Sequence, residues 1–140
     1  MFLSLSQLPV PAIFLYSIVV AAILIYVPYL LVAFARVQIG YDLSAPRAMF
    51  DKLPPYAQRA AWAHENSFEG FMVFAAAALM AYVTGVNSPQ AVNAVIAFII
   101  ARLLYSIFYI ANIPLLRSLM FGIASFSSGT LFFLSLMQIK

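Results

Sequence analysis

The stretch from Gln58 to Val86, QRAAWAHENSFEGFMVFAAAALMAYVTGV, decides the fold, because it joins a cluster of polar side chains to a continuous apolar run. The apolar part, residues 72–86, would span only ~22 Å as a helix at 1.5 Å per residue. The hydrocarbon core of a bilayer is ~30 Å thick. A helix that crosses the membrane must therefore reach back to about Asn66, and this places Glu69 just inside the hydrocarbon.

The composition predicts an integral membrane protein that forms a single domain over residues 1–140. The chain is 66% hydrophobic and has a mean hydropathy of +1.03, whereas soluble domains are about half apolar. Because it has no cysteine, any thiol chemistry must use a thiol supplied by a ligand. One histidine without a His/Cys cluster predicts no metal site. The net charge of +3 rests on few residues, and we interpret it as topology information rather than as a nucleic-acid signal.

Four apolar segments, residues 10–35, 56–84, 89–111 and 115–137, predict an all-α bundle of four transmembrane helices. Helices are favoured over a barrel because the apolar runs are continuous and do not alternate. Pro28 is expected to kink the first helix, since proline removes a backbone hydrogen bond. Ser88 is expected to cap the third helix, with Pro89 in its first position.

The distribution of basic residues predicts the orientation of the bundle. The polar loop at residues 38–55 contains or adjoins four cations, Arg36, Arg47, Lys52 and Arg59, and Arg117 follows the third turn. The second loop carries no charge. The positive-inside rule therefore puts loops one and three in the cytoplasm and both termini on the opposite side, as in a bacterial inner membrane or another cytoplasm-facing membrane.

Two helical faces carry the polar residues that need an explanation. Arg59, Trp62, Asn66 and Glu69 are spaced by three or four positions and share one face. Arg102, Tyr105 and Tyr109 share another, with Arg102 near the middle of the third span.

A mid-membrane arginine costs several kcal/mol unless it is paired, and Glu69 is the acid expected nearest to Arg102. The pair can be an interhelical ion pair that locks the bundle, or part of a buried cavity for an anionic ligand; both readings stay open. Arg117 and Ser118 open the fourth helix. Arg117 opposes the helix dipole, so it either marks the topology or faces an anion near the helix amides.

Two motifs together resemble the MAPEG family, the membrane-associated proteins in eicosanoid and glutathione metabolism. RAAWAHENSFEGF, residues 59–71, is similar to the family signature, and ARLLYSIFYIANIPLLRSL, residues 101–119, is similar to its third-helix arginine and tyrosine and its fourth-helix Arg-Ser. The run before the second span looks like bacterial members. The resemblance covers essentially the whole chain and implies a homotrimer of four-helix subunits with glutathione between neighbouring subunits.

The resemblance also implies a function and a set of site residues. The expected reaction is conjugation of glutathione to a lipophilic electrophile, reduction of a lipid hydroperoxide, or isomerisation of a lipid endoperoxide. Arg117 would stabilise the thiolate, with Ser118 beside it as the second catalytic candidate. The expected glutathione-binding residues are Asn66 and Glu69 at the glutamyl end, with Arg102, Tyr105, Tyr109, Arg59 and His64.

Four departures from the family pattern keep a rival function open. Glu65 stands where the family's glutathione-dependent prostaglandin synthase has an arginine, and Trp62 replaces another basic residue. Tyr105 replaces a site histidine but can still donate a hydrogen bond, and Phe121 replaces a tyrosine. The rival is a non-catalytic MAPEG-like protein that binds lipid or another membrane protein. A structural accessory subunit is a third reading. The expected partners are membrane lipid, further copies of the chain and a lipophilic small molecule, with no nucleic acid.

Overall fold

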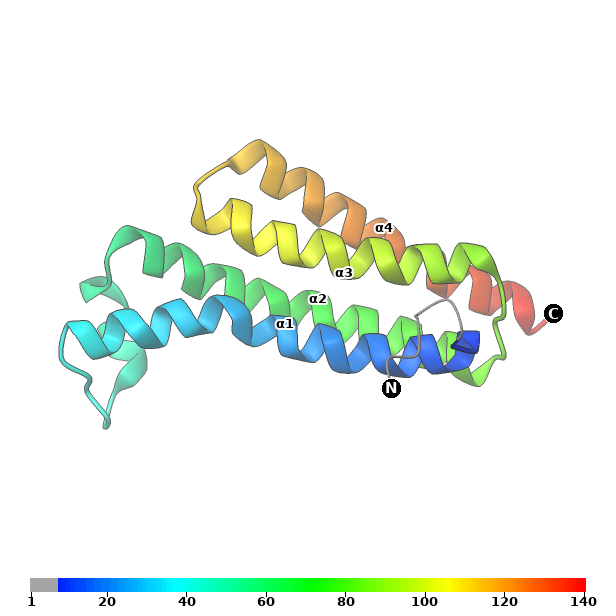
Figure 1. Ribbon diagram of the computed structural model, residues 1–140, viewed down its shortest axis with the longest axis horizontal. Coiled ribbons are helices and arrows are strands. Elements are labelled where there is room, and N and C mark those ends of the chain that lie inside the picture. Colours follow the sequence, from blue (N-terminus) through cyan, green and yellow to red (C-terminus); the bar gives the residue numbers. More distant parts are fainter. Residues whose placement is uncertain (1–7) are drawn as a thin grey trace.

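Four long helices form the part of the chain described by the computed structural model, residues 8–140. They are α1 (Val10–Gln38), α2 (Pro55–Val83), α3 (Pro89–Ile110) and α4 (Pro114–Gln138), and a short 3₁₀ helix, η2 (Pro46–Lys52), lies in the first loop (Figure 1). Each long helix is long and apolar enough to cross a membrane. The predicted all-α membrane fold is confirmed, and every predicted helix boundary lies within three residues of the observed one.

Proline and cap residues explain where the helices begin. Each of the four long helices has a proline at its first or second position, where the missing N–H costs nothing. Ser88 caps α3, as predicted, because its side chain accepts a hydrogen bond from the backbone N–H of Ala91 at 3.3 Å. Gly40 and Gly85 follow α1 and α2 with φ values of +90° and +74°, a conformation that glycine adopts without strain.

The Ser88 cap gives a stability prediction. Ser88→Ala is expected to destabilise the protein by about 1 kcal/mol, because the N–H of Ala91 loses its partner. The measurement is thermal unfolding in detergent. Asn93→Ala, on an exposed position of the same helix, is the matched control and is expected to leave the midpoint unchanged or slightly raised. Equal midpoints for Ser88→Ala and the wild type would contradict the assignment.

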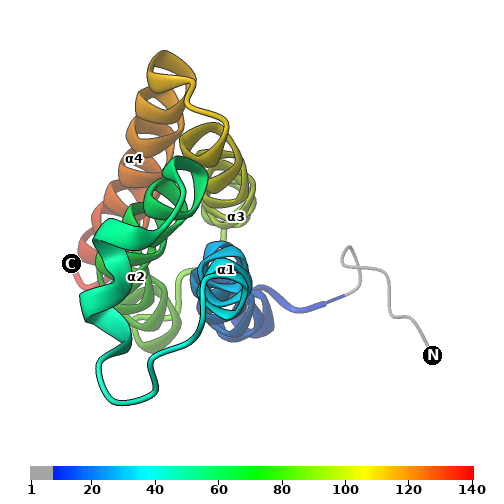
Figure 2. The same ribbon diagram turned by 90° about the vertical axis from the view of Figure 1, so that its left-hand side faces the viewer.

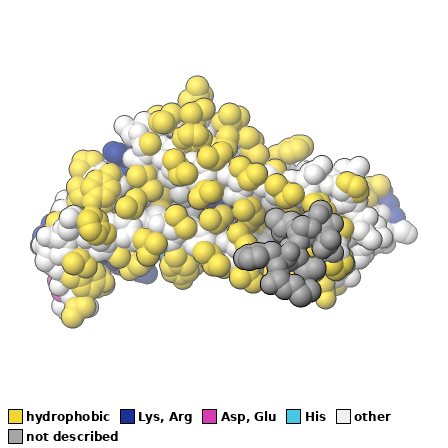
Figure 3. All heavy atoms as spheres, viewed as in Figure 1, with side chains coloured by type: hydrophobic (Ala, Val, Ile, Leu, Met, Phe, Trp, Pro, Cys, Tyr) yellow, Lys and Arg dark blue, Asp and Glu magenta, His cyan; other side chains and the backbone are white. Residues whose placement is uncertain are grey.

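The helices pack around α2. It contacts α1, α3 and α4 (Figure 2), and its buried face is rich in small side chains, including Ala77 and Ala81. Such residues let helix backbones approach closely in membranes. The rings of Phe74 in α2 and Phe98 in α3 stack with their centres 3.8 Å apart. Large apolar side chains cover much of the outer surface (Figure 3), as expected for a protein whose solvent is lipid.

The first loop closes one end of the bundle. Met49 of η2 and Leu53 are buried, and Gln58 Nε2 donates to the carbonyl oxygen of Leu53 at 3.2 Å. Asp42 accepts hydrogen bonds from the hydroxyl of Ser44 at 2.7 Å and from two backbone amides. These bonds hold the pKa of the Asp42 carboxyl below its ordinary value, so the carboxylate that accepts them stays ionised at lower pH than a free aspartate does. The first loop and the α3–α4 turn lie toward the same end of the molecule (Figure 1).

Candidate functional site

Arg102 is buried between α2 and α3, as its position in the sequence predicts. Its side chain is only 5% exposed. Its Nη1 donates to Asn66 Oδ1 at 3.0 Å and its Nη2 donates to Ser67 Oγ at 3.2 Å. Both acceptors belong to α2, so the guanidinium group of α3 is hydrogen-bonded to the polar face of α2.

The expected direct ion pair between Glu69 and Arg102 is replaced by a bridge through Asn66. Because arginine can only donate, the Asn66 carbonyl oxygen faces Arg102, and the Asn66 amide nitrogen donates to Glu69 Oε2 at 3.1 Å. Within residues 8–140, no carboxylate oxygen lies within 4.0 Å of the Arg102 guanidinium. Helical spacing places Glu69 and Asn66 on one face of α2. It does not predict which of the two side chains contacts Arg102.

Gly70 and Ser67 complete the environment of Arg102, and the sequence analysis did not single them out. A Cβ atom at position 70 would lie 3.2 Å from Arg102 Cζ, closer than side chains ordinarily pack. The hydroxyl of Ser67 donates to the Ala63 carbonyl at 2.7 Å, which leaves its lone pairs for Arg102. A glycine inside a helix is a weak sequence signal. Here the glycine is explained by the close approach of Arg102 from α3.

An open groove of about 370 Å³ on the surface joins the two polar faces. Its lining is Trp62, Glu65, Asn66 and Glu69 of α2 with Tyr105 and Tyr109 of α3. We call this space the polar cavity. Of the four residues predicted to share one face, Trp62, Asn66 and Glu69 line this space together, whereas Arg59 lies outside its lining. This part of α2 meets the tyrosine face of α3.

Arg117 stands at the edge of the polar cavity. Its Cζ lies 4.6 Å from the centre of the Tyr109 ring, and Arg102 Cζ lies 4.4 Å from the centre of the Tyr105 ring. The two rings meet edge to face with their centres 5.6 Å apart. The two guanidinium groups therefore stack on adjacent tyrosines, by cation–π contacts that leave their charge unneutralised. Ser118 follows Arg117 near the start of α4, is exposed, and lies outside the lining of the polar cavity.

The comparison with protein families identifies the family of the chain. The model of the MAPEG family matches residues 13–137, nearly the whole chain. The chain belongs to the MAPEG family. Neither a curated protein nor a solved structure matches it. The MAPEG family includes glutathione transferases and related enzymes, so the polar cavity is the natural candidate site in this MAPEG chain.

Arg59 and His64 belong to the MAPEG motif, but both lie outside the lining of the polar cavity. Arg59 Nε donates to the carbonyl oxygen of Ile110 at 2.9 Å, and so satisfies a carbonyl at the end of α3. His64 lies two residues from both Trp62 and Asn66, which puts it on the opposite face of α2. Its Nδ1 lies 2.7 Å from the Ile25 carbonyl oxygen of α1; since a carbonyl only accepts, Nδ1 is the donor.

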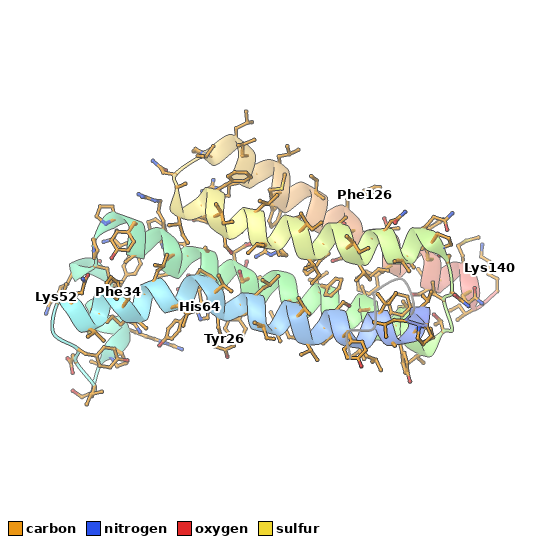
Figure 4. The ribbon with its side chains drawn as sticks, in the orientation of Figure 1. Tyr26, Phe34, Lys52, His64, Phe126 and Lys140 are labelled. Carbon is orange, nitrogen blue, oxygen red and sulfur yellow. The ribbon has the colours of Figure 1, made fainter. Side chains whose placement is uncertain are left out.

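Pro28 lies in the turn of α1 whose backbone contacts His64. Proline has no N–H for the carbonyl four residues earlier and crowds that turn of the helix. In α1 that carbonyl belongs to Leu24, and the Ile25 carbonyl that His64 contacts is the next one along the chain. The His64 ring packs against the rings of Tyr26 (Figure 4) and Tyr29. His64 therefore gives α2 a polar contact with α1 near Pro28.

A second polar space of this MAPEG chain lies between α1, η2 and α2. It measures about 530 Å³, and its lining includes Arg36, Arg47, His64 and Glu65. Arg36 is buried, and its Nε has no hydrogen-bond partner among the described residues. Sequence reasoning treated Arg36 and Arg47 as topology signals only, because neither belongs to a recognisable motif. The fold brings them to the face of α2 that carries His64.

Proposed function

We propose that this protein is a membrane-bound glutathione-dependent transferase or peroxidase that acts on lipophilic electrophiles or lipid hydroperoxides. The observation that carries the proposal is the Arg117 guanidinium over Tyr109, at the edge of a cavity lined by Asn66, Glu69 and Tyr105. A cation beside a thiol lowers the pKa of the thiol and so supplies the nucleophilic thiolate. The chain has no cysteine, so the thiol comes from the ligand.

The polar cavity offers partners that fit the two ends of glutathione. Glu69 uses one carboxylate oxygen for Asn66 and keeps the other for the ammonium group of the glutamyl residue. The hydroxyl groups of Tyr105 and Tyr109 can donate to peptide carbonyls or carboxylates. In this placement the thiol end points toward Arg117, whose charge no described carboxylate neutralises within 4.0 Å.

Both proposed reactions use this thiolate. In conjugation, the sulfur forms a bond to the electrophilic carbon, and the leaving group departs with its electron pair. In peroxide reduction, the sulfur attacks the terminal peroxide oxygen, the O–O bond breaks, and the alkoxide takes a proton to become the alcohol. A second glutathione then converts the sulfenic acid to the disulfide and water. Arg117 stabilises the thiolate in both cases, and the lipophilic partner enters from the membrane.

The non-catalytic alternative has one observation in its favour. Glu65 lines the polar cavity, and a carboxylate there repels the two carboxylates of glutathione and also lies one helical turn from Glu69. A protein that binds lipid or another membrane protein would not need a cation at this position. Direct measurement of glutathione binding separates this alternative from the enzyme.

The proposal includes a homotrimer in which the polar cavity lies near the cytoplasmic side of a bacterial inner membrane. The basic first loop and the start of α4 lie toward one end of the molecule (Figure 1). Because the first turn of α4 carries Arg117, this arrangement supports the proposed orientation. Chemical cross-linking in detergent, followed by mass measurement, is expected to give a three-chain species as the largest product. A product that stops at one chain would contradict the trimer.

Trp62 supplies a built-in probe of glutathione binding. It is the only tryptophan of the chain and it lines the polar cavity. Glutathione is expected to change its fluorescence saturably at or below millimolar concentration, and calorimetry in detergent should give the same dissociation constant. Glu69→Gln is expected to weaken binding about 10-fold or more, because a charge-assisted hydrogen bond contributes about 1.5–3 kcal/mol.

The controls of this binding experiment use a ligand and a reaction. S-methylglutathione, which keeps the carboxylates and the ammonium group, is expected to bind with similar affinity. Conjugation of 1-chloro-2,4-dinitrobenzene should proceed in the same preparation. No binding of glutathione at millimolar concentration would end the glutathione proposal and leave the non-catalytic function as the better account.

A further inference from the structure

The α3–α4 turn, residues 111–113, satisfies all but one of the carbonyl groups at the end of α3. The backbone N–H groups of Ala111, Asn112 and Ile113 donate, at 2.9, 3.1 and 2.9 Å, to the carbonyl oxygens of Ile107, Tyr109 and Phe108. Asn112 has a φ of +60°, the left-handed conformation that ends many helices and that asparagine tolerates. The remaining carbonyl belongs to Ile110. Its helical partner would be the residue four positions on, and this is Pro114, which has no N–H.

Arg59 supplies the missing donor from another helix. Its Nε lies 2.9 Å from the Ile110 carbonyl oxygen, although the two residues are 51 positions apart in the sequence. A charged donor makes a stronger hydrogen bond than a neutral one, and a cation at the carboxyl end of a helix also interacts favourably with the helix dipole. Arg59 is half-buried near the start of α2, so it caps α3 and ties α2 to the α3–α4 turn.

The same turn determines where Arg117 lies. The backbone N–H of Arg117 donates to the carbonyl oxygen of Ile113 at 3.1 Å, so the first turn of α4 starts directly from the α3–α4 turn. The Arg117 guanidinium stacks on the Tyr109 ring, and Tyr109 directly precedes Ile110. The contact between Arg117 and Tyr109 therefore spans the turn, and it depends on the direction in which α4 leaves α3.

Two residues of α2 hold this end of α3. Trp62 lies one helical turn after Arg59, and its ring centre lies 6.4 Å from that of Tyr109. A contact between rings restricts distance more than direction, whereas a hydrogen bond also fixes the direction of the carbonyl group. Among the described residues, Arg59 makes the one hydrogen bond between α2 and the segment 110–114. Loss of this bond leaves the α3–α4 turn free to rotate against α2.

We propose that Arg59 is a positioning residue, which caps α3 at Ile110 and thereby keeps Arg117 over Tyr109, with its charge toward the thiol. The inference rests on the proposed function and adds to it a residue outside the polar cavity. Arg59 does not line that cavity. Its substitution should therefore weaken the activation of the thiol and leave the binding of glutathione nearly unchanged. The family motif groups Arg59 with the glutathione-binding residues, and the geometry gives it a different role.

Arg59→Gln and Arg59→Met separate the hydrogen bond from the charge. The side-chain nitrogen of glutamine is as many bonds from the backbone as Arg59 Nε, so Arg59→Gln keeps the donor and loses the charge. Methionine has the same length and no donor. Arg59→Met is expected to lower kcat for 1-chloro-2,4-dinitrobenzene about 10- to 100-fold, the effect of a small displacement of a catalytic group. Arg59→Gln should retain most of the wild-type rate.

The controls of this experiment cover charge, fold and glutathione binding. Lys52→Gln removes a cation from an exposed position of the first loop and should keep the wild-type kcat. Arg59→Ala is a second variant without a donor and should behave as Arg59→Met does. Calorimetry should give nearly the same dissociation constant of glutathione for all variants. The kcat/KM profile of Arg59→Met should rise at a higher pH than that of the wild type, because the bound thiol loses part of the influence of the Arg117 charge.

A measurement without glutathione separates this inference from the proposed function. Protons over the face of an aromatic ring resonate upfield, and Arg117 Cζ lies 4.6 Å from the centre of the Tyr109 ring. In protein with isotope-labelled arginine, the Arg117 side-chain NMR signal is identified by its absence in Arg117→Ala. It is expected upfield in the wild type, in Arg59→Gln and in Lys52→Gln, and close to the position of free arginine in Arg59→Met.

Three outcomes would overturn the inference. The first is an Arg117 signal that is the same in Arg59→Met and in the wild type. The second is an equal loss of kcat in Arg59→Gln and Arg59→Met, because this would assign the effect to the charge. The third is a parallel loss of kcat and of glutathione affinity in Arg59→Met. A displaced Arg117 signal in Arg59→Met, in a protein that does not bind glutathione, would support the positioning of Arg117 by Arg59 and reject the proposed function.

Discussion

Arg117→Ala is expected to lower kcat for glutathione conjugation about 10²- to 10³-fold, the usual effect of removing one donor that stabilises developing or full negative charge. The dissociation constant of glutathione should change far less. Arg117 contacts the Tyr109 ring, with its Cζ 4.6 Å from the ring centre, and its charge is directed to the thiol end of the proposed site. The measurement is steady-state kinetics with 1-chloro-2,4-dinitrobenzene together with the fluorescence titration of Trp62.

The pH dependence and a conservative variant make this prediction specific. Without the cation the thiol of bound glutathione has a higher pKa, so the kcat/KM profile of Arg117→Ala should rise at a higher pH than that of the wild type. Arg117→Lys keeps the charge and should recover part of the rate, although lysine lacks the planar group that stacks on tyrosine. Equal losses of kcat and of glutathione affinity in Arg117→Ala would remove the thiolate role.

Asn66→Leu is expected to destabilise the protein by about 2–4 kcal/mol, because it leaves a buried cation with one fewer partner. Asn66 is the only residue that joins Arg102 to Glu69 in the described part of the chain, through hydrogen bonds of 3.0 and 3.1 Å. The same substitution should abolish glutathione binding, since Glu69 loses the group that orients its carboxylate. The measurements are thermal unfolding in detergent and the Trp62 titration.

Graded controls show whether the effects of Asn66→Leu come from the loss of the hydrogen-bonded bridge or from the change in side-chain volume. Ser67→Ala removes one acceptor of Arg102 and keeps the bridge, so it should cost about 1 kcal/mol and retain glutathione binding. Asn93→Leu makes the same chemical change at an exposed position of α3 and should leave both properties unchanged. If Asn66→Leu unfolds at the wild-type temperature, Arg102 does not depend on the bridge.

The sequence predicts the helices well because their signals are local. Apolar length determines the number of spans, and prolines at the helix starts fix where they begin. The depth of Arg102 follows from counting residues, and the shared face of Asn66 and Glu69 follows from the helical period. None of these inferences requires knowledge of how one helix is rotated against another.

The contacts between helices could not be predicted, because they depend on that rotation and on rotamers. The spacing of α2 allows either Glu69 or Asn66 to reach Arg102, and the structure selects Asn66. The family motif contains both His64 and Asn66, whereas the helical period places them on opposite faces of α2. In the structure they do lie on opposite faces, with His64 against α1 and Asn66 against α3. The absence of a side chain at Gly70 is explained only by the structure, which places the Arg102 guanidinium against it.

The ultraviolet absorbance of the thiolate, titrated with pH for glutathione bound in the polar cavity, tests the central claim most directly. In the wild type the thiol of bound glutathione should ionise with a pKa well below the value of about 8.5 for a free cysteine thiol. In Arg117→Ala the pKa should return to the ordinary range while glutathione stays bound. A bound thiol with the same ordinary pKa in both proteins would contradict the claim that Arg117 activates glutathione in this site.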